Sequence, residues 1–282
     1  MSLSPRAWSV AITSGKGGVG KTSVTVHVAT ALAEQGLRVG VVDADLALGN
    51  IDVILGLSPR WHLGHVIAGE RTLDDILLDG PCGIRIAPAG SGVRSLTTLD
   101  PAQWARLSHA IDDFAGRVDV LLLDTATGIG DTVLDMVALA DCTLVVTTFD
   151  PAALVDAYAL VKLVDALGDT RDIGVLVNAT RRVTDADTAF RQLSLVSQRF
   201  LGRTLRDAGA IVHDPEVQAA GQTTRILNAP SSAARRGFHE LARRLSSWSA
   251  GAPGTHSQTT RVRPPRVADL AARLVTGAQP CA

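Results

Sequence analysis

The stretch that decides the fold is S-G-K-G-G-V-G-K-T, residues 14–22. It fits the pattern G-x-x-x-x-G-K-[ST] of loops that bind nucleotide phosphates. The fixed positions of that pattern are Gly15, Gly20, Lys21 and Thr22. An apolar run precedes the stretch and a helix-like segment follows it, which is the strand–loop–helix context that the motif requires. The sequence therefore predicts a loop whose backbone N–H groups, together with the N-terminus of the next helix, bind phosphate oxygens.

Each residue type in this loop suits a different part of a magnesium-bound nucleoside triphosphate. The Lys21 ammonium is expected to neutralise the β and γ phosphates, and the Thr22 hydroxyl is expected to be a ligand of Mg²⁺. The glycines let the backbone approach phosphate closely. The residues expected to contact the nucleotide here are Gly15, Lys16, Gly17, Gly18, Val19, Gly20, Lys21, Thr22 and Ser23.

Short apolar runs alternate with longer amphipathic segments along most of the chain. The runs are Trp8–Thr13, Arg38–Asp43, Ile84–Ala87, Val118–Asp124, Cys142–Thr148, Ile173–Asn178 and Ala210–Val212. The helical segments are 22–35, 101–115, 131–139, 151–167, 184–200 and 231–248. Continuous apolar runs are typical of parallel strands covered on both faces, and strand–helix alternation builds a doubly wound sheet. We therefore predict an α/β fold with a doubly wound, mostly parallel sheet in a three-layer sandwich.

One domain is expected over residues 1–248. Residues 249–264 are rich in Gly, Ser, Thr and Pro, which is typical of a flexible linker. The tail at 265–282 contains an apolar-periodic segment at 266–275. Two interpretations stay open for this tail: a short amphipathic helix on a membrane surface, or a tail without fixed structure. No window approaches the roughly 18 uninterrupted apolar residues of a transmembrane helix.

Charge is distributed unevenly along the chain. Residues 1–180 carry 12 Lys and Arg against 21 Asp and Glu, whereas residues 181–282 carry 15 against 7. A basic C-terminal third is suited to nucleic acid, anionic lipid or an acidic partner, and it is equally consistent with a solvated surface. Only three lysines occur among the 27 basic residues, and Lys16 and Lys21 both lie in the glycine-rich stretch. A compact ammonium is thus present where phosphate is expected.

Aspartates follow two of the predicted strands. The second apolar run continues as D-A-D at 43–45, and the fourth ends at Asp124 in D-T-A-T-G. The carboxyl ends of parallel strands meet at one edge of the sheet, beside the phosphate loop. Carboxylates there can hold Mg²⁺ through water or orient an attacking water, although Asp43 and Asp45 could instead cap a helix. The residues predicted to hold magnesium are Thr22, Asp43 and Asp124.

The form K-G-G-x-G-K-T resembles the deviant Walker family of MinD, ParA, the nitrogenase iron protein and the arsenite-pump ATPases. The resemblance implies a P-loop NTPase of the SIMIBI type that binds ATP and Mg²⁺ and dimerises face to face. In that family the early lysine, here Lys16, reaches the phosphates of the opposing subunit. The catalytic residues that the resemblance implies are Lys16, Lys21 and Asp45. The implied switch residues are Asp43, Asp45, Asn50, Asp124 and Gly128.

The resemblance also implies where the base is bound. Asn178 ends the strand I-G-V-L-V-N, and in the resembled family this asparagine hydrogen-bonds adenine. The segment G-A-I-V-H-D at 209–214 lies where the family carries I-P-x-D beside the base, which makes Asp214 a candidate contact. Val212 replaces the proline of that pattern. No N-K-x-D guanine motif is present, so ATP is expected rather than GTP.

Further stretches resemble the FlhG/FleN branch of this family, which regulates flagellar number. They are D-A-D-L-A-L-G-N-I-D-V-I-L-G-L at 43–57, H-V-I-A-G-E at 65–70, D-I-L-L-D-G-P-C-G-I at 75–84, I-A-P-A-G-S-G-V at 86–93 and D-P-A-A-L-V-D-A-Y-A-L-V-K-L at 150–163. This resemblance implies a slow, partner-stimulated ATPase that forms a homodimer on ATP. The implied partners are an FlhF-type GTPase, a flagellar transcription activator or switch-complex proteins. The implied location is cytoplasmic, peripheral on the inner face of the cell membrane or at the pole.

Other functions fit part of the sequence. A ParA-like segregation ATPase would use basic residues such as Arg235, Arg236, Arg243 and Arg244 to bind DNA without sequence preference. A metabolic P-loop enzyme of the dethiobiotin synthetase type would not explain the segment at 43–57. An iron–sulfur carrier would need paired cysteines, which the sequence lacks. A protein that binds ATP without hydrolysing it would not need both Asp45 and Asp124.

Overall fold

The computed structural model describes residues 7–46, 48–90, 99–168, 171–215, 217, 232–251, 264 and 266–270. Its strands are β1 (Trp8–Ser14), β2 (Val39–Ala44), β3 (Leu78–Asp79), β4 (Arg85–Ala87), β5 (Val120–Thr127), β6 (Cys142–Thr147), β7 (Asp172–Thr180) and β8 (Arg206–Val212). They form one sheet in the order β3-β4-β2-β5-β1-β6-β7-β8, in which only the β3–β4 pair is antiparallel. The strand that carries the glycine-rich loop, β1, is therefore central and has neighbours on both sides.

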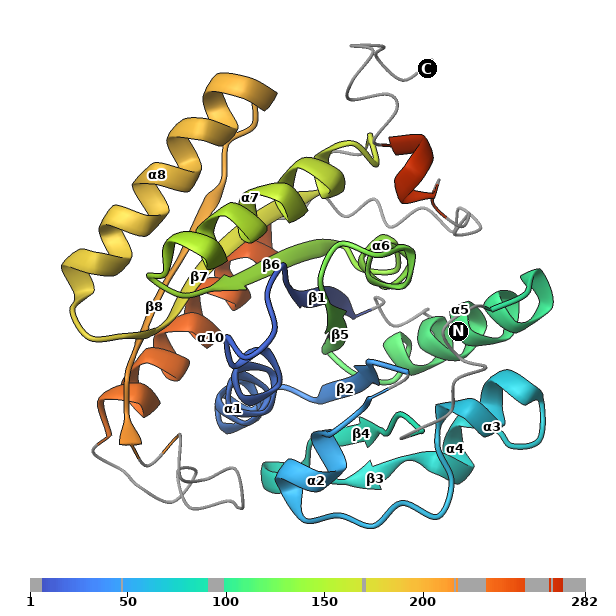
Figure 1. Ribbon diagram of the computed structural model, residues 1–282. Coiled ribbons are helices and arrows are strands. Elements are labelled where there is room, and N and C mark those ends of the chain that lie inside the picture. Colours follow the sequence, from blue (N-terminus) through green and yellow to red (C-terminus); the bar gives the residue numbers. More distant parts are fainter. Residues whose placement is uncertain are drawn as a thin grey trace.

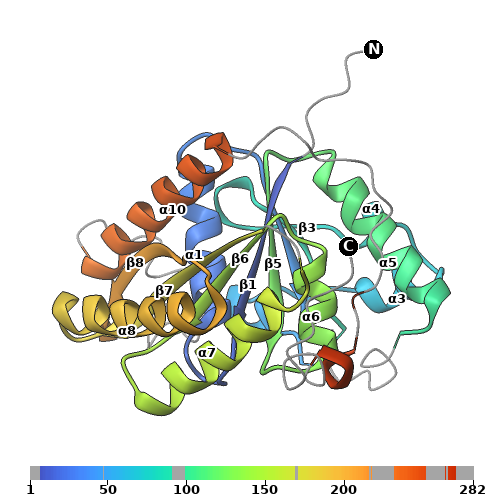
Figure 2. The ribbon, with the colours of Figure 1, turned by 90° about the horizontal axis from the view of Figure 1, so that it is seen from above.

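Helices cover both faces of this sheet (Figures 1 and 2). The helices α1 (Lys21–Glu34) and α10 (Ala233–Gly251) pack on one face; the other carries α5 (Pro101–Ala115), α6 (Asp131–Ala138), α7 (Pro151–Asp165) and α8 (Val183–Leu201). Buried aliphatic side chains fill the space between the layers, and the strands β1, β2 and β5 are almost wholly inaccessible to solvent. The predicted doubly wound three-layer α/β fold is confirmed.

The long predicted helices are present, and two of them begin as expected. Asp100 accepts the N–H of Gln103 at 2.8 Å and Asp150 accepts that of Ala153 at 3.0 Å, so each caps a helix whose first residue is proline. Short elements between β2 and β4 were not predicted, because each is too brief to show a period: α2 (Ile51–Leu55), α3 (Leu63–Ala68), α4 (Leu73–Ile76), β3 and the 3₁₀ turn η1 (Pro81–Gly83).

Two predicted boundaries at the C-terminal side differ from the structure. β8 begins at Arg206 rather than Ala210, because this edge strand carries polar residues that hide it from a search for apolar runs. α10 continues to Gly251, so the first three residues of the predicted linker at 249–264 are helical. Trp248 packs against Gly174 of β7, which holds this last part of α10 on the sheet. Most of the predicted linker lies outside the described residues.

Part of the C-terminal tail is docked on the domain. Leu270 is fully buried and joins the core on the α5–α7 face, with Val267 packed against it. The Val267 N–H donates to Asp131 Oδ1 at 2.6 Å, and Arg266 pairs with the same carboxylate at 3.4 Å. Of the predicted amphipathic segment at 266–275, residues 267–270 are helical and 271–275 lie outside the described residues. No helix in the described part of the chain has the length and apolarity needed to cross a membrane.

The contact between β7 and α10 depends on a missing side chain at Gly174. A Cβ there would lie 2.5 Å from Cη2 of Trp248 and 2.6 Å from its Cζ3. We expect Gly174→Ala to lower the free energy of unfolding by about 1–3 kcal/mol, the usual cost of overpacking a core. Denaturant unfolding of Gly174→Ala, Trp248→Phe and the double variant would measure this loss of stability.

The smaller Trp248→Phe side chain removes the clashing atoms, so the double variant should lose less stability than the two single losses combined. Additivity within about 0.5 kcal/mol would show that the two residues do not interact.

Candidate phosphate-binding site

The glycine-rich loop is held in place from two sides. It leaves β1 at Ser14 and enters α1 at Lys21, which confirms the strand–loop–helix context. A Cβ on Gly15 would lie 2.3 Å from the backbone oxygen of Asp156 in α7, so only glycine allows the loop to pass this helix. Gly20 precedes α1 with a left-handed φ of 86°, and a Cβ there would meet the Asn178 amide at 2.5 Å. The loop conformation therefore depends on packing against α7 and β7 as well as on its own glycines.

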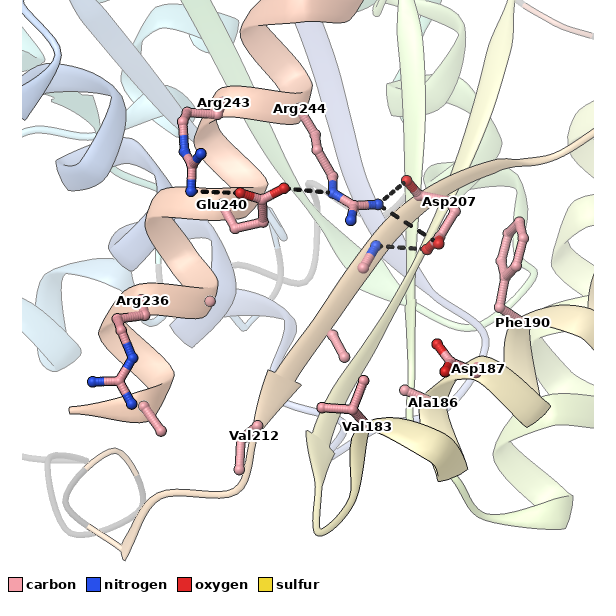
Figure 3. A pocket seen from close by; sticks show the side chains of 14 residues that line it. Val183, Ala186, Asp187, Phe190, Asp207, Val212, Arg236, Glu240, Arg243 and Arg244 are labelled. Atoms are coloured by element: carbon pink, nitrogen blue, oxygen red, sulfur yellow. Dashed lines mark hydrogen bonds and ion pairs between the residues drawn. The ribbon is translucent and has the colours of Figure 1, made fainter.

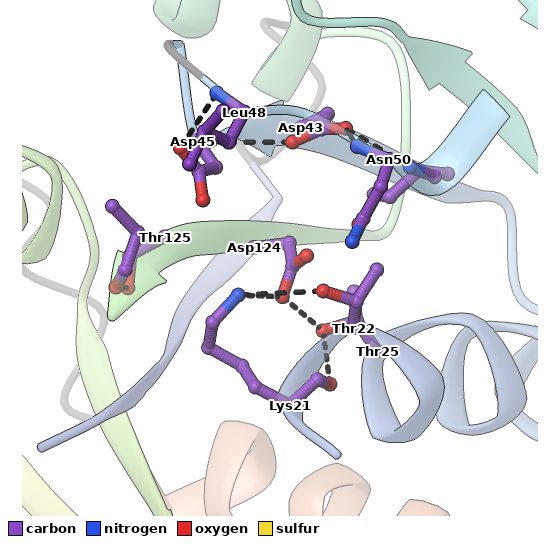
Figure 4. Close-up of polar contacts among 11 residues, drawn as sticks. Lys21, Thr22, Thr25, Asp43, Asp45, Leu48, Asn50, Asp124 and Thr125 are labelled. Carbon is purple, nitrogen blue, oxygen red and sulfur yellow. Dashed lines mark hydrogen bonds and ion pairs between the residues drawn. The ribbon is translucent and has the colours of Figure 1, made fainter. Parts of the chain in front are cut away.

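A buried ion pair joins the loop to β5 (Figure 4). Lys21 Nζ lies 2.9 Å from Asp124 Oδ1, and the two side chains are 5% and 1% exposed. The hydroxyl of Thr25, one turn along α1, donates to the same oxygen at 2.8 Å. Thr25 was not singled out from the sequence, although its i+4 spacing from Lys21 places both residues on one face of the helix. The structure brings the predicted Lys21 and Asp124 into direct contact.

A second carboxylate lies on the neighbouring strand. Asp43 is paired in register with Asp124 across β2 and β5, and it is fully buried. Its oxygens accept backbone N–H groups of Asn50 at 2.9 Å, Ile51 at 3.1 Å and Asp45 at 3.3 Å. Burial, and then the charge of Asp124, raises the pKa of Asp43 to about 7, because both make its ionised form costly. Neither aspartate is the N-cap of α2, which is Asn50, although the Asp43 carboxylate accepts N–H groups at the start of that helix.

These groups fit a magnesium ion bound to a nucleotide. Two buried carboxylates lie side by side, and Asp124 Oδ2 is buried with no hydrogen-bond partner among the described residues. The Thr22 hydroxyl belongs to the same cluster, 3.5 Å from Lys21 Nζ. Mg²⁺ prefers oxygen ligands and commonly keeps several waters, so a hydrated ion would satisfy the unpartnered oxygen and reduce the repulsion between the carboxylates. The residues that would hold it are Thr22, Asp43 and Asp124.

Lys16 has a different environment from Lys21. Its Nζ lies 2.8 Å from Oδ2 of Asp150, the cap of α7, and the two side chains are 42% and 47% exposed. This hydrogen bond raises the pKa of Lys16 and lowers that of Asp150. Sequence reasoning recognised Asp150 only as a helix cap, because nothing in the local pattern shows that it faces the loop. The structure thus separates the two loop lysines: Lys21 is buried with Asp124, and Lys16 is at the surface with Asp150.

The remaining predicted switch residues surround this cluster. Asp45 is half-buried, and its carboxylate accepts the Leu48 N–H at 3.1 Å, three residues further along the chain. Asn50 contacts Asp43 through its backbone. Gly128 has a φ of 102°, and its N–H donates to the Ser14 carbonyl at 2.8 Å. A γ-phosphate could receive the Gly128 N–H only after that bond to Ser14 breaks.

A pocket of about 190 Å³ beside the loop contains the predicted base contacts. Asn178 lines it and donates from Nδ2 to the Val19 carbonyl at 2.8 Å, which leaves its Oδ1 oriented as an acceptor. Ser23 and Val212 also line this pocket. Asp214 lines it too, but the Ser232 hydroxyl donates to Asp214 Oδ2 at 2.5 Å, so this carboxylate links the pocket to the start of α10.

The Thr25 hydroxyl should matter for binding of the magnesium nucleotide. Thr25→Val keeps the shape of the side chain but leaves Asp124 Oδ1 with Lys21 alone, so Asp124 would be held less firmly. We expect the Kd for Mg²⁺–nucleotide to rise about tenfold, since a hydrogen bond to a charged group contributes about 1.5 kcal/mol. Isothermal titration calorimetry would measure it. Thr30→Val is the matched control, because Thr30 is a buried threonine of α1 that bonds only to the Val26 carbonyl, at 2.9 Å. Equal effects of the two substitutions would exclude the role of Thr25.

Comparison with known proteins identifies the family of this chain. The family model described as the CobQ/CobB/MinD/ParA nucleotide binding domain matches residues 10–218. The chain is 43% identical over 241 residues to the antiactivator FleN of Pseudomonas aeruginosa, covering 85% of this chain and 86% of FleN. It is 38% identical over 156 residues to the flagellum site-determining protein YlxH of Helicobacter pylori, covering 55% of this chain and 52% of YlxH.

A solved structure shows the same architecture. The MinD cell division protein of Aquifex aeolicus superposes with a TM-score of 0.71 at 27% identity, covering 86% of this chain and 97% of that one. The family model covers most of β1, the phosphate loop, both aspartate-bearing strands and the asparagine that lines the pocket beside the loop. The chain belongs to the CobQ/CobB/MinD/ParA family of nucleotide-binding proteins.

Proposed function

We propose that this protein is a regulatory ATPase of the MinD type that dimerises around ATP and controls the number or placement of flagella. The observation that carries the proposal is the different burial of the two loop lysines. Lys21 is buried with Asp124 inside its own subunit, whereas Lys16 is exposed beside the same loop. A buried cation can act only on a nucleotide in its own loop, while an exposed one can reach a second molecule.

Exposed apolar side chains surround the nucleotide site and support a dimer at this face. Leu48, Ile129 and Phe149 follow β2, β5 and β6, and Val155 lies in the first turns of α7. Their exposures are 72%, 42%, 47% and 68%. All four belong to the edge of the sheet where the parallel strands end, which is also where the phosphate loop lies. A patch of this kind at a ligand site is typical of a protein interface, and a second copy bound face to face would cover it.

Hydrolysis would depend on positioning rather than on a strong base. Lys21 would neutralise the transferred phosphate, and the Gly128 N–H would turn from Ser14 to the γ-phosphate. Asp45 would orient the attacking water once its turn opens, since its carboxylate is now bonded to the Leu48 N–H. Magnesium would supply neutralisation of the phosphate oxygens, held by Thr22, Asp43 and Asp124. Since Asp45, Gly128 and Lys16 each have an internal partner in this structure, turnover is expected to be slow until dimerisation or a partner rearranges them.

The flagellar role rests on the relatives. FleN is described as an antiactivator and YlxH as a flagellum site-determining protein, and the match to FleN spans most of both chains. An antiactivator acts on a transcription activator, so we infer such a partner here. An FlhF-type GTPase and switch-complex proteins are further candidates from the same branch.

The docked tail suggests how the protein could meet a membrane. Val267 and Leu270 are the large apolar residues of its described part, and both now face the protein core. They could enter a lipid surface only after the bonds of residues 266 and 267 to Asp131 break. Asp131 begins α6, three residues after Gly128, so a change at the predicted switch residue Gly128 would act directly on this attachment. We propose that ATP binding frees the tail for peripheral attachment to the inner face of the cell membrane.

A ParA-like DNA-binding function is less well supported. Of the four arginines that suggested it, Arg235 pairs with Glu34 at 2.8 Å and Arg243 with Glu240 at 2.5 Å. Arg244 pairs with Glu240 at 3.1 Å and Asp207 at 3.6 Å. These ion pairs reduce the positive potential available to a phosphate backbone.

Lys16→Ala should abolish ATP-dependent dimerisation while leaving nucleotide binding largely intact, because the substitution removes the exposed cation and keeps Lys21. Analytical ultracentrifugation with ATP would measure dimerisation, and calorimetry would measure binding. Lys162→Ala, the third lysine and remote from the loop in α7, is the control. Asp45→Ala should have the opposite phenotype, a persistent ATP dimer with little phosphate release. A dimer that forms normally with Lys16→Ala would exclude the lysine from the interface.

Deleting residues 265–282 should abolish ATP-dependent binding to vesicles that contain anionic lipid, as measured by co-sedimentation. Asp131→Ala should instead raise vesicle binding without nucleotide, because it removes the carboxylate that holds residues 266 and 267. Vesicle binding that survives the deletion would place membrane contact elsewhere on the protein.

A further inference from the structure

Two histidines, His62 and His65, form the start of α3 at the β3–β4 end of the sheet (Figure 1). Histidine is the side chain whose charge ordinarily changes between about pH 5 and pH 8. By contrast, the groove over β8, between α8 and α10, contains arginines and carboxylates that pair with one another, such as Glu240 with Arg243 and Arg244 (Figure 3). The start of α3 is therefore a place where contacts can change with pH.

Each of the two histidine rings accepts a backbone N–H through its Nδ1 atom. His62 is the N-cap of α3, and its Nδ1 accepts the Gly64 N–H at 3.1 Å, while His65 Nδ1 accepts the His62 N–H at 3.4 Å. A ring that accepts at Nδ1 is neutral and carries its hydrogen on Nε2, so a further proton can be added only at Nδ1. Protonation of either ring therefore removes the acceptor, and with it the bond that this ring makes at the start of the helix.

The surroundings of His62 favour its neutral form. The centroids of the two rings are 4.1 Å apart, so a charge on both rings would be repulsive. Burial, and then the charge of His65, lowers the pKa of His62, while Glu70 acts in the opposite direction. The stabilisation that the neutral cap provides is therefore complete above the ordinary pKa of 6.5, and it is lost as the pH falls through the lowered pKa.

No other charged group among the described residues acts on this cap. The segment 88–90, which packs against it, contains no titratable side chain. The remaining charged side chains around α3 have partners of their own: Arg60 and Arg71 lie over the Trp61 ring, Arg106 donates to the Ile67 carbonyl, Asp74 pairs with Arg117, and Asp75 accepts from Thr72.

The cap holds the segment that follows β4. A Cβ on Gly90 would lie 2.4 Å from His62 Cε1, so the imidazole lies directly on the backbone of this segment. The Leu63 N–H, in the first turn of α3, donates to the Pro88 carbonyl at 2.9 Å. Opening of the cap would therefore remove both contacts that support residues 88–90 from this side.

The same segment reaches the magnesium site through Ala89. A Cβ on Gly49 would lie 2.3 Å from the Ala89 Cβ and 2.8 Å from Asp43 Oδ2, so no side chain fits between them. Gly49 is followed by Asn50 and Ile51, whose N–H groups donate to Asp43. Contacts therefore run without a gap from the start of α3 to a carboxylate that would hold magnesium.

We propose that the start of α3 is a proton-sensitive control of nucleotide binding. When His62 and His65 are protonated, the cap opens, residues 88–90 lose their support, and the turn at Gly49 no longer holds Asp43 in place. The affinity for the magnesium nucleotide then falls. The proposal rests on nucleotide binding, the property of the family, and not on dimerisation or on a flagellar role.

Calorimetry of Mg²⁺–ADP binding between about pH 8 and pH 5 tests this control. His62→Asn keeps a good N-cap that does not titrate. We expect equal Kd values at about pH 8, and at about pH 5 a wild-type Kd about fivefold above that of His62→Asn, the effect of losing one helix cap. The ratio at each pH cancels the titration of Asp43 and of the nucleotide, which both proteins share. His109→Asn is the matched control, because His109 is exposed on α5 outside the cap and should follow the wild type.

Long-range proton–nitrogen NMR of the wild type reports the state of the two rings without nucleotide. Both should carry hydrogen on Nε2 at neutral pH, and the Gly64 amide should shift as the His62 ring titrates. A His62 ring with its hydrogen on Nδ1 at neutral pH would overturn the proposal, as would a Kd ratio that stays at one throughout. Absence of Mg²⁺–ADP binding at every pH would overturn nucleotide binding itself and this control with it, whereas a constant ratio overturns the control alone.

Discussion

The contact between Lys21 and Asp124 is the interaction on which the rest of the site depends. It joins the first turn of α1 to the C-terminal half of β5 at 2.9 Å, with both side chains buried. Removing one partner of a buried pair costs about 3–5 kcal/mol, because an uncompensated charge remains in the interior. The pair therefore has a structural role besides its role toward phosphate. It fixes where α1 begins, and so where the loop's N–H groups point.

Because Asp43 and Asp124 are both buried, binding of a cation beside them is favourable. Asp43 and Asp124 are neighbours on adjacent strands, and a single ammonium serves them both. The result is a raised pKa for Asp43 and an unpartnered oxygen on Asp124. Any ion that satisfies these groups also stabilises the C-terminal halves of β2 and β5. The predicted switch residues Asp45 and Asn50 follow β2, and Gly128 follows β5. Nucleotide binding is in this way linked to the conformation of the segments that partners would sense.

Three surfaces of the molecule are built around this centre. The strand ends carry exposed apolar residues next to Lys16, the start of α6 holds the C-terminal tail through Asp131, and the β8 edge carries a groove between α8 and α10. The first two are connected to the phosphate site by short segments, because Gly128 and Asp131 belong to one loop-to-helix junction. The groove lies three strands away from β1.

Local patterns were enough to predict the sheet, the long helices and the phosphate site. Apolar runs and amphipathic segments can be recognised from residues that lie close together in the chain. In a parallel sheet, the carboxyl ends of the strands lie at one edge, which places Asp43 and Asp124 beside the loop. The motif is equally local, so Lys21 and Thr22 could be assigned without coordinates. Elements of a few residues, such as α2 and α4, lacked a period and were missed, and the polar edge strand β8 was predicted too short.

Contacts between residues distant in the sequence were decided only by the tertiary structure. Thr25 bonds Asp124, Lys16 bonds Asp150, Asp214 bonds Ser232, and Asp131 holds the tail; each pair joins elements whose separation no sequence pattern encodes. The hydrogen bond from Arg244 of α10 to the Asp207 carbonyl of β8 likewise joins elements that are distant in the sequence. The sequence by itself determined which residues can bind a magnesium nucleotide, because that chemistry depends on residue types and on their spacing in the chain. The tertiary structure decided which of them are buried, paired or exposed, because packing alone sets the distances between groups.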